Sequence, residues 1–199
     1  MKNILVIGSG GREHTFVWKL SKDKNVNKIF CIPGNGGTAK IAINYNIDIK
    51  DFNKIYEYVL DQNIDIILVG PEAPLNDGIV DFFREKNIKI FGPDKFASQL
   101  ECSKIFARDF MSKNNIPQPI YFECNNMTQA LEIKHQIGLP LVLKADGLAG
   151  GKGVIICKNE SDYQDGIKIM LKDRKFGSAS DKISIEECLI GEEVSVFAI

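Results

Sequence analysis

Residues of the kinds that build metal sites and disulfide frameworks are scarce in this sequence. Histidine occurs only twice, and the five cysteines are widely spaced, with no Cys-x-x-Cys pair among them. An odd number of scattered thiols is typical of buried, reduced side chains in a reducing compartment. The sequence therefore predicts a cytoplasmic protein without a Cys/His metal cluster.

Neither an excess of charge nor a long apolar run is present. The chain has 25 Lys+Arg against 26 Asp+Glu, a formal net charge of −1 at pH 7. Because nucleic acids and anionic membranes bind basic surfaces, this balance predicts no nucleic-acid partner and no membrane partner. The apolar run 2–7 is too short for a signal segment or a membrane-spanning helix. The partners expected are small molecules, and the pattern says nothing of oligomeric state.

Two common nucleotide-binding motifs are incomplete. A Walker A loop would need glycine where Asp146 stands, and serine or threonine where Gly153 stands. The dinucleotide fingerprint starts with Gly8 and Gly10, but Glu13 occupies the place of its third glycine. A nucleotide would have to be held by another scheme, and an NAD-dependent oxidoreductase is disfavoured.

Compact apolar runs alternate with amphipathic stretches through the first half of the chain. This pattern predicts an α/β fold with a doubly wound parallel sheet. One helix is expected directly after the glycine turn that ends at Gly11, and two more are expected at 51–62 and 76–86. The expected strands are 2–7, 27–32, 64–69 and 88–91.

A glycine turn joins the first strand to the first helix. Gly10 and Gly11 open the helix, and Arg12, Glu13 and His14 crowd its first turn. Free N–H groups at a helix N-terminus are a natural phosphate site. The plainer interpretation is that Glu13 compensates the helix dipole, Arg12 is a solvated charge and His14 is a capping residue.

Two further loops follow strands of the same predicted sheet. Asn35 lies in the loop 33–39, and Glu72 follows the strand 64–69. Ligands bind an open α/β sheet at the carboxyl ends of its strands, so both side chains are candidates for substrate contact. The alternatives are a long turn for 33–39 and a charge at a helix N-terminus for Glu72.

The most informative stretch is LVLKADGLAGGKGVII, residues 141–156. It predicts a strand, a glycine-rich loop and a second strand. Glycine lets backbone N–H groups approach an anion closely, and two lysines add charge that suits phosphate oxygens. The alternative is a hairpin with a flexible turn. The candidate phosphate-binding residues are Lys144, Gly147, Gly150, Gly151, Lys152 and Gly153.

Around this stretch the second half of the chain predicts helices and short strands. One helix carries Lys104, with Phe106, Phe110 and Met111 as its buried stripe. Further helices are expected at 128–137 and 161–172, and strands at 120–123, 182–187 and 192–196. The apolar run 194–199 ends without a turn, so we expect the chain to be an N-terminal piece of a longer protein.

The backbone between the last two expected strands could present hydrogen-bonding groups to an adenine edge. Glu193, just beyond it, could accept hydrogen bonds from ribose hydroxyls. The alternative is an exposed acidic turn.

Taken together, these blocks resemble one known family. The lysine-bearing helix, the strand lysine, the glycine loop and the acidic hinge resemble ATP-grasp enzymes, and the full set resembles the phosphoribosylamine–glycine ligases, also called glycinamide ribonucleotide synthetases. Two small departures are Cys102, where glycine is usual, and Gly150, where alanine is common. The blocks are GSGGREH (8–14), PGNGGT (33–38), VGPEAPL (69–75), FGP (91–93), QLECSK (99–104), KADGLAGGKGV (144–154) and EECLIGEE (186–193).

The resemblance implies a domain plan and a reaction. Residues 1–103 would form a Rossmann-like substrate domain, 104–118 a linker helix, and 119–199 the small ATP-grasp subdomain with the start of the large one. In the family, ATP phosphorylates the carboxylate of glycine, and the amine of 5-phosphoribosylamine attacks the acyl phosphate. Glycinamide ribonucleotide, ADP and phosphate result, as part of purine biosynthesis.

The resemblance also assigns residues to the two ligands. No catalytic residue is implied. Phosphoribosylamine would be bound by Gly10, Gly11, Arg12, Glu13, His14, Asn35 and Glu72. ATP would be bound by Lys104, Lys144, Gly147, Gly150, Gly151, Lys152, Gly153, Glu186, Glu187, Leu189 and Glu193.

The cofactors implied are ATP and Mg²⁺ or Mn²⁺. The metal ligands and most of the glycine site are expected beyond Ile199, so these residues alone would be inactive. Two other functions stay open. One is an ATP-grasp carboxylase or ligase that activates bicarbonate, and the other is a non-catalytic nucleotide-binding fragment.

Overall fold

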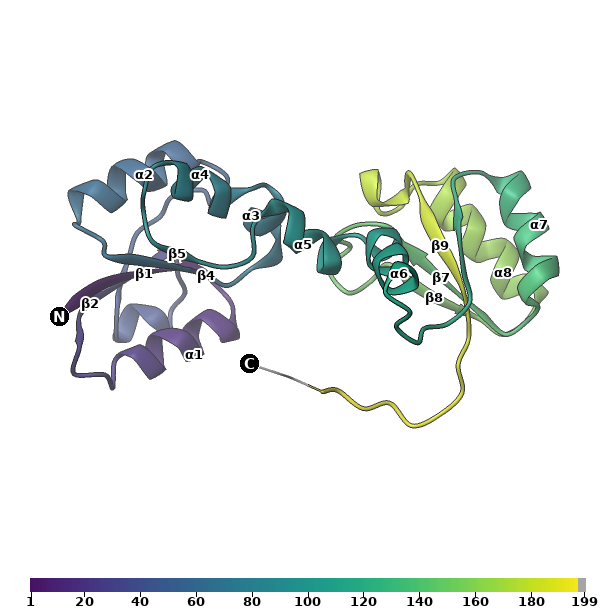
Figure 1. Cartoon of the computed structure of the whole chain (residues 1–199), viewed down its shortest axis with the longest axis horizontal. Coiled ribbons are helices and arrows are strands. Elements are labelled where there is room, and N and C mark those ends of the chain that lie inside the picture. Colours follow the sequence, from purple (N-terminus) through teal and green to yellow (C-terminus); the bar gives the residue numbers. More distant parts are fainter. Residues whose placement is uncertain (197–199) are drawn as a thin grey trace. The chain divides into compact units, whose positions relative to one another are not determined.

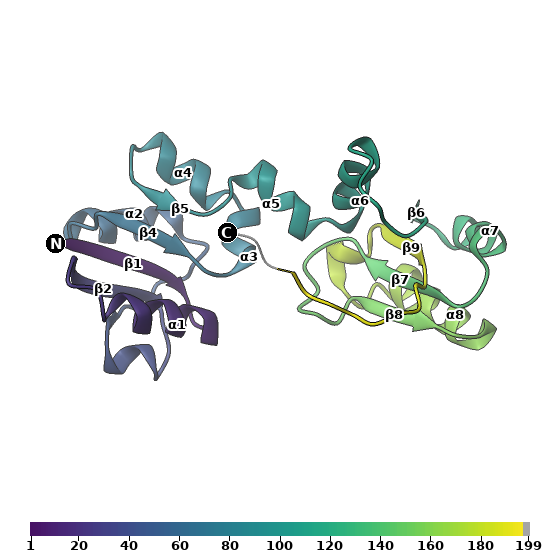
Figure 2. The same ribbon diagram turned by 60° about the horizontal axis from the view of Figure 1, so that its bottom comes forward.

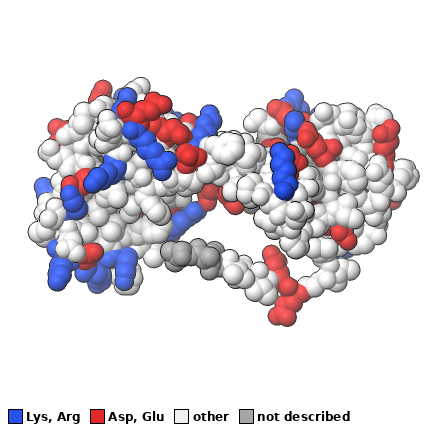
Figure 3. Space-filling model, in the orientation of Figure 1, with Lys and Arg blue, Asp and Glu red and all other residues white. Residues whose placement is uncertain are grey.

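The computed structural model describes residues 1–196. They divide into two compact units, with the boundary between Gln99 and Leu100. The boundary between the units falls inside helix α5 (Lys95–Cys102). No helix of the described residues is long and apolar enough to cross a membrane. Side chains of both charge signs are interspersed on the face of each unit drawn in Figure 3.

The first unit is built on a parallel sheet of five strands in the order β3-β2-β1-β4-β5, and Figure 2 shows β1 at its centre, between β2 and β4. The strands β1 and β2 are the longest, and β1 is buried from Ile4 onward. The strands are β1 (Lys2–Gly8), β2 (Val26–Pro33), β3 (Ile43–Asn44), β4 (Ile66–Val69) and β5 (Ile90–Phe91).

Helices cover both faces of this sheet, with α1 on one face and α2 and α4 on the other (Figure 1). Leu5, Ile7 and Phe30 belong to the larger core beneath α2 and α4, whereas Val6 and Val17 belong to the core beneath α1. The doubly wound parallel sheet predicted from the sequence is therefore confirmed. The helices are α1 (Gly11–Leu20), the 3₁₀ turn η1 (Thr38–Lys40), α2 (Phe52–Asp61), α3 (Glu72–Asn76), α4 (Ile79–Glu85) and α5 (Lys95–Cys102).

The helix expected over 76–86 is present as α4 but begins later, at Ile79. A separate short helix, α3, precedes it, and Gly78 lies between the two. Gly78 has φ +92°, in the left-handed region that interrupts a right-handed helix. Glu72 lies in the first turn of α3, and Gly70 and Pro71 separate it from the end of β4.

The second unit is built on an antiparallel sheet of four strands in the order β6-β9-β7-β8. Leu143 of β7 and Ile185 of β9 point into one core with Tyr163 and Ile167 of α8. The elements are α6 (Lys104–Lys113), β6 (Tyr121–Cys124), α7 (Met127–Ile137), β7 (Leu141–Ala145), β8 (Val154–Cys157), α8 (Glu160–Ile167), the π turn η2 (Lys168–Lys172), the 3₁₀ turn η3 (Gly177–Ser180) and β9 (Ile183–Glu187).

Three expectations for the second unit are corrected. The helix expected over 161–172 ends as an α-helix at Ile167 and continues as a π turn. No strand forms at 192–196, because none of the strands in the described sheets pairs with that segment. In α6 the buried apolar residue is Ile105, whereas Phe110 is 42% exposed, so the predicted stripe of Phe106, Phe110 and Met111 is wrong.

Candidate functional site

The carboxyl ends of β1 and β4 lie next to each other in the first unit. Ile7 pairs with Val69, which places the turn after β1 beside the turn after β4. The chain connections run outward in opposite directions from these two strands, so their ends form the switch point at which open α/β sheets bind ligands. Most of the residues predicted to bind substrate are gathered here.

Glu13 closes the glycine turn from within. Its side chain is almost fully buried, and its Oε2 accepts a hydrogen bond from the backbone N–H of Gly10 at 2.6 Å. This is the returning half of a capping box. A Cβ on Gly70 would lie 2.0 Å from Oε1 of Glu13, and one on Gly8 would lie 2.5 Å from its Cγ. Glycine is therefore required at both positions by the carboxylate packed against them.

Arg12 and Glu72 meet across the switch point. The Nη2 of Arg12 donates to Oε1 of Glu72 at 2.8 Å, and its Nε lies 3.7 Å from Oε1 of Glu13. The hydrogen bond from Arg12 lowers the pKa of Glu72. Both side chains remain partly exposed, with a positive and a negative group presented together at the strand ends.

Asn35 ties the loop after β2 to the glycine turn. Its Nδ2 donates to the carbonyl oxygens of Ser9 and Gly10, at 2.8 and 3.3 Å. Its Oδ1 accepts from the backbone N–H groups of Gly37 and Thr38. A Cβ on Gly37 would lie 2.6 Å from the imidazole ring of His14, so that ring also packs on this loop. Asn35 and His14 are thereby brought to the same edge of the sheet.

A cavity of about 440 Å³ opens at this edge. It is lined by glycines of the first turn, by Glu13 and Pro71, and by a segment after β3 that contains Asn46 and Asp48. The sequence did not predict that segment as part of the site. The only signal was the polar pattern after Ile43 and Asn44, a strand of two residues that is too short to show periodicity.

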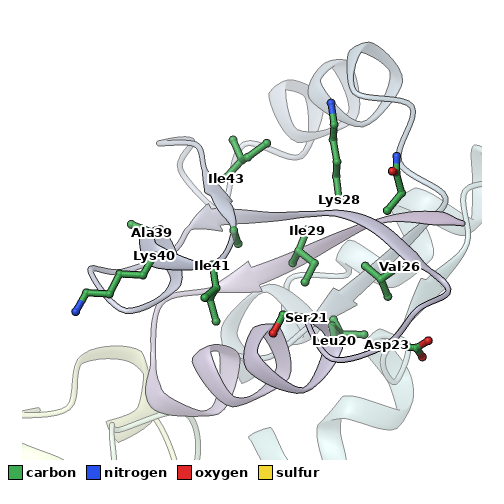
Figure 4. Close-up of a pocket in the computed structure, with 12 residues that line it drawn as sticks. Leu20, Ser21, Asp23, Val26, Lys28, Ile29, Ala39, Lys40, Ile41 and Ile43 are labelled. Carbon is green, nitrogen blue, oxygen red and sulfur yellow. The ribbon is translucent and has the colours of Figure 1, made fainter.

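Another hollow of the first unit, about 490 Å³, lies away from the strand ends (Figure 4). Leu20 at the end of α1, together with Val26 and Ile29 of β2, gives it an apolar floor, while Lys40 points away from it. None of the predicted site residues lines it. It is therefore not the candidate site.

In the second unit the glycine-rich loop connects β7 and β8 as predicted. Lys144 pairs with Val154, and the N–H of Ala145 donates to the carbonyl of Gly153 at the base of the loop. Gly147 has φ +153° and packs against Ala179. The base of the loop is therefore fixed to the rest of the unit.

The tip of this loop has a different character. Gly150 and Gly151 have φ of +57° and +76°, and a Cβ on either would meet no atom within 4 Å. Lys152 beside them is exposed. The tip thus presents backbone and one ammonium group to open space, which is the arrangement expected of a loop that covers phosphate groups.

Asp146 anchors the start of α6 to the end of β7. Its Oδ1 accepts from the hydroxyl of Ser103 at 2.9 Å and from the backbone N–H of Ile105 at 3.1 Å. Lys104 lies between these two residues, and its Nζ donates to the carbonyl of Glu101 at 3.5 Å. The anchor fixes the backbone of Lys104 at the carboxyl end of the strand that carries Lys144.

Lys144 and Glu186 are directly paired. Side chains alternate along a strand, so these two project from the face opposite the apolar core. The Nζ of Lys144 lies 2.7 Å from Oε2 of Glu186. Arg108 of α6, which the sequence reasoning missed, binds both oxygens of the same carboxylate, at 3.1 and 2.5 Å. No local sequence signal marked it, because its partner lies 78 residues away along the chain.

Glu186 is buried and charged. Its side chain is 1% exposed, and Ser184 also donates to it at 3.0 Å. Burial alone would raise the pKa of Glu186, but the hydrogen bonds from Arg108 and Lys144 outweigh burial and hold the pKa below its usual value. The carboxylate therefore stays ionised and keeps two cations beside it.

The remaining predicted adenine and ribose contacts are less organised. Glu187 donates its N–H to the carbonyl of Ile120 and accepts from the N–H of Ile120 through Oε2. Leu189 is 64% exposed, and Glu193 lies in a segment without helix or strand. Of the four residues predicted to contact adenine or ribose, all of them among the described residues, Glu186 is the one that pairs with Lys144.

The described residues fit a polyphosphate better than a metal. Lys144 and the open glycine tip supply cations and N–H donors of the kind that hold phosphate oxygens. In contrast, no group of three or more His, Cys, Asp or Glu side chains among residues 1–196 could hold a metal ion.

Comparisons with known proteins agree across the whole chain. Residues 2–101 match the model for the phosphoribosylglycinamide synthetase N domain, and residues 102–199 match that for its ATP-grasp (A) domain. The phosphoribosylamine–glycine ligase of Clostridium acetobutylicum is 46% identical over 196 residues, which are 98% of this chain and 47% of that protein. The chain spans about half the length of the curated relatives it matches.

Solved structures support the same relationship. The crystal structure of phosphoribosylamine–glycine ligase from Thermotoga maritima superposes with a TM-score of 0.74 at 28% identity, covering 96% of this chain and 44% of that one. An N5-carboxyaminoimidazole ribonucleotide synthetase from the same organism shares the fold, with a TM-score of 0.66 at 21% identity over 94% of this chain and 46% of that one. With both family models matched in order, the chain belongs to the phosphoribosylglycinamide synthetase family.

Proposed function

We propose that the protein carrying this chain ligates glycine to 5-phosphoribosylamine, giving glycinamide ribonucleotide, ADP and phosphate. Purine biosynthesis in the cytoplasm is the proposed setting, with ATP as phosphoryl donor and Mg²⁺ or Mn²⁺ as metal. The observation that carries the proposal is the placement of Lys144 at the base of a glycine loop whose tip is open, in a chain that both family models match in order.

The chemistry explains why such a site is needed. A carboxylate is a poor electrophile, and its conversion to an acyl phosphate supplies a leaving group. Charge builds on the transferred phosphoryl group, so the site must offer positioned cations and N–H donors. Lys144 and Lys104 would supply the cations, and the loop 147–153 would close over the phosphates. Closure would also exclude water, which would otherwise hydrolyse the acyl phosphate.

The first unit supplies groups that suit phosphoribosylamine. The N-terminus of α1 and the guanidinium of Arg12 fit a phosphate, and the carboxylate of Glu72 fits ribose hydroxyls or an amine. The cavity of about 440 Å³ beside them is large enough for a small sugar phosphate. Because Glu13 and Asn35 hold the surrounding turns, we assign them to shaping this site as well as to bordering it.

A bicarbonate-activating ligase is the second candidate. The fold shared with N5-carboxyaminoimidazole ribonucleotide synthetase favours it, although that likeness concerns the fold alone. Such an enzyme would form a carboxyphosphate where the proposed ligase forms a glycyl phosphate. The two candidates therefore differ in the acid that ATP activates, and this can be measured directly.

The deciding experiment measures ADP release by the intact protein that carries this chain. Glycine, 5-phosphoribosylamine and bicarbonate are each supplied and omitted in turn. Release that requires glycine and phosphoribosylamine together supports the proposal. Release that depends on bicarbonate and ignores glycine would select the second candidate.

A further inference from the structure

One carboxylate in the second unit has two cationic partners. Glu186 of β9 receives Arg108 from α6 and Lys144 from β7, and it is 1% exposed. A buried carboxylate needs one positive charge for neutrality, so the second cation leaves the cluster with a net charge of +1. With this excess positive charge, the cluster can offer one of its two cations to a bound anion.

The two cations do not have equivalent positions. Arg108 binds both oxygens of Glu186 through Nε and Nη2, a two-point contact that holds a planar carboxylate in a fixed orientation. Lys144 makes a single contact, to Oε2 at 2.7 Å. Its side chain is 24% exposed, whereas that of Arg108 is 14% exposed. Lys144 is therefore the cation that can leave without breaking the two-point contact.

We propose that Arg108 is a positioning residue, which remains the permanent partner of Glu186 and so allows Lys144 to transfer its ammonium group to the phosphates of a bound nucleotide. This inference rests on the proposed function, since it takes the ligand of Lys144 to be ATP. Arg108 itself touches no ligand in this scheme. It acts through Glu186.

The consequence of losing Arg108 follows from the charges. Without the guanidinium, Glu186 has Lys144 as its one remaining cation in the cluster. The ammonium group is then needed to neutralise a buried carboxylate, and its release to a phosphate would leave that charge unpaired, which is costly. Lys144 should bind Glu186 more tightly and ATP less well.

The test compares the Arg108→Gln variant with the unaltered chain by two measurements. The first is the dissociation constant for ATP and, separately, for adenosine, which has no phosphate. ATP should bind about tenfold more weakly, the loss of roughly one charged contact, while adenosine affinity stays the same. The second is the rate at which an acetylating reagent modifies Lys144, followed by mass spectrometry. That rate should fall.

Three further variants serve as controls. Arg108→Lys keeps a positive charge beside Glu186 and should retain most of the ATP affinity. Lys144→Met should lose ATP affinity, whether or not Arg108 is present. Arg174→Gln removes an exposed arginine of the same unit and should change neither measurement. If Arg108→Gln does not fold, the Arg108→Lys variant is measured in its place, and unchanged ATP affinity together with an unchanged acetylation rate supports the inference.

Two results would overturn the inference. Faster acetylation of Lys144 in Arg108→Gln would mean that Arg108 merely holds the fold together around it. Equal weakening of ATP and adenosine would mean the same. If the unaltered chain binds neither compound, the proposed function fails, and the acetylation rates alone decide whether Arg108 controls Lys144.

Discussion

Glu13 has a double role among the single residues of the site. Its carboxylate caps the turn through the N–H of Gly10, and it fills the space in which side chains at Gly8 and Gly70 would lie. One buried side chain thus fixes the turns after β1 and β4 at once. The relative position of these two turns therefore depends on the packing of Glu13.

Replacing Gly70 with alanine should destabilise the first unit. The new methyl group would overlap Oε1 of Glu13, and overpacking of this kind costs about 1–3 kcal/mol. The measurement is the free energy of unfolding in urea. Gly36→Ala is the matched control, because a Cβ there would meet no atom within 4 Å. Equal stability of the two variants would show that Glu13 moves aside freely.

The acid stability of the second unit should depend on Glu186. Its pKa in the folded protein lies below the ordinary value of 4.5, because the hydrogen bonds from Arg108 and Lys144 outweigh burial. The stabilisation is therefore fully present above about pH 4.5 and is lost as pH falls through the folded-state pKa.

Melting temperatures measured from pH 7 down to pH 3 test this dependence. In Glu186→Gln the decline on acidification should be shallower, although the variant should be less stable at pH 7 by about 3–5 kcal/mol, since two half-buried cations lose their buried partner. Glu132→Gln, on the exposed side of α7, is the control and should leave the decline unchanged. An equally steep decline in Glu186→Gln would assign the acid sensitivity to other groups.

Helix α6 positions the cationic residues of the candidate phosphate site in the second unit. Asp146 fixes its first turn to the end of β7, and Arg108 fixes its middle to β9. Lys104 lies within the first of these anchors, between Ser103 and Ile105. An element tied at two points to the sheet can hold cations at defined positions, which a loop could not do.

Asp146→Ala should loosen the start of α6. Two hydrogen bonds to Ser103 and Ile105 disappear, with an expected loss of about 1–3 kcal/mol. Faster hydrogen exchange at the amide of Ile105 would report this opening directly. The exposed Asp165 of α8 offers a matched control as Asp165→Ala. Unchanged exchange at Ile105 would show that the anchor is dispensable.

The elements themselves could be predicted to different extents. Apolar runs such as 2–7 and 141–144 predicted their strands well, because a buried strand needs an unbroken or alternating apolar pattern. The buried stripe of α6 was wrong because its inward face carries Arg108, a charge that a search for apolar periodicity rejects. The strand expected at 192–196 failed because pairing depends on a partner strand, which local sequence does not reveal.

The candidate site divides in the same way. The glycine loop and Lys144 could be found from the sequence, because glycines and a lysine at a strand end have a local signature. Arg108 could not be found, since its partner Glu186 lies 78 residues away along the chain. The structural role of Glu13 against Gly70 was equally hidden, because it depends on β1 and β4 being neighbours.

At the scale of the whole molecule, the chain matches two domain models of one family in order, the N domain over 2–101 and the ATP-grasp (A) domain over 102–199. The chain spans about half of its curated relatives, and residues 1–196 hold no cluster that could bind a metal. The 199-residue chain alone should therefore bind ATP without releasing ADP when glycine and phosphoribosylamine are added. Calorimetry and an ADP assay on one preparation measure both properties. ADP formation above background by the chain alone would contradict this division.

The burial of the native cysteines has a practical consequence for following the glycine loop. Cys31, Cys102, Cys124 and Cys157 are buried, and burial raises the pKa of Cys31 and of Cys157 to about 11. Such thiols react slowly with alkylating dyes. With Cys188 changed to serine, a single cysteine introduced at the exposed Leu148 would be the one thiol open to labelling among the described residues. A fluorophore there would report, in real time, whether nucleotide addition moves the loop.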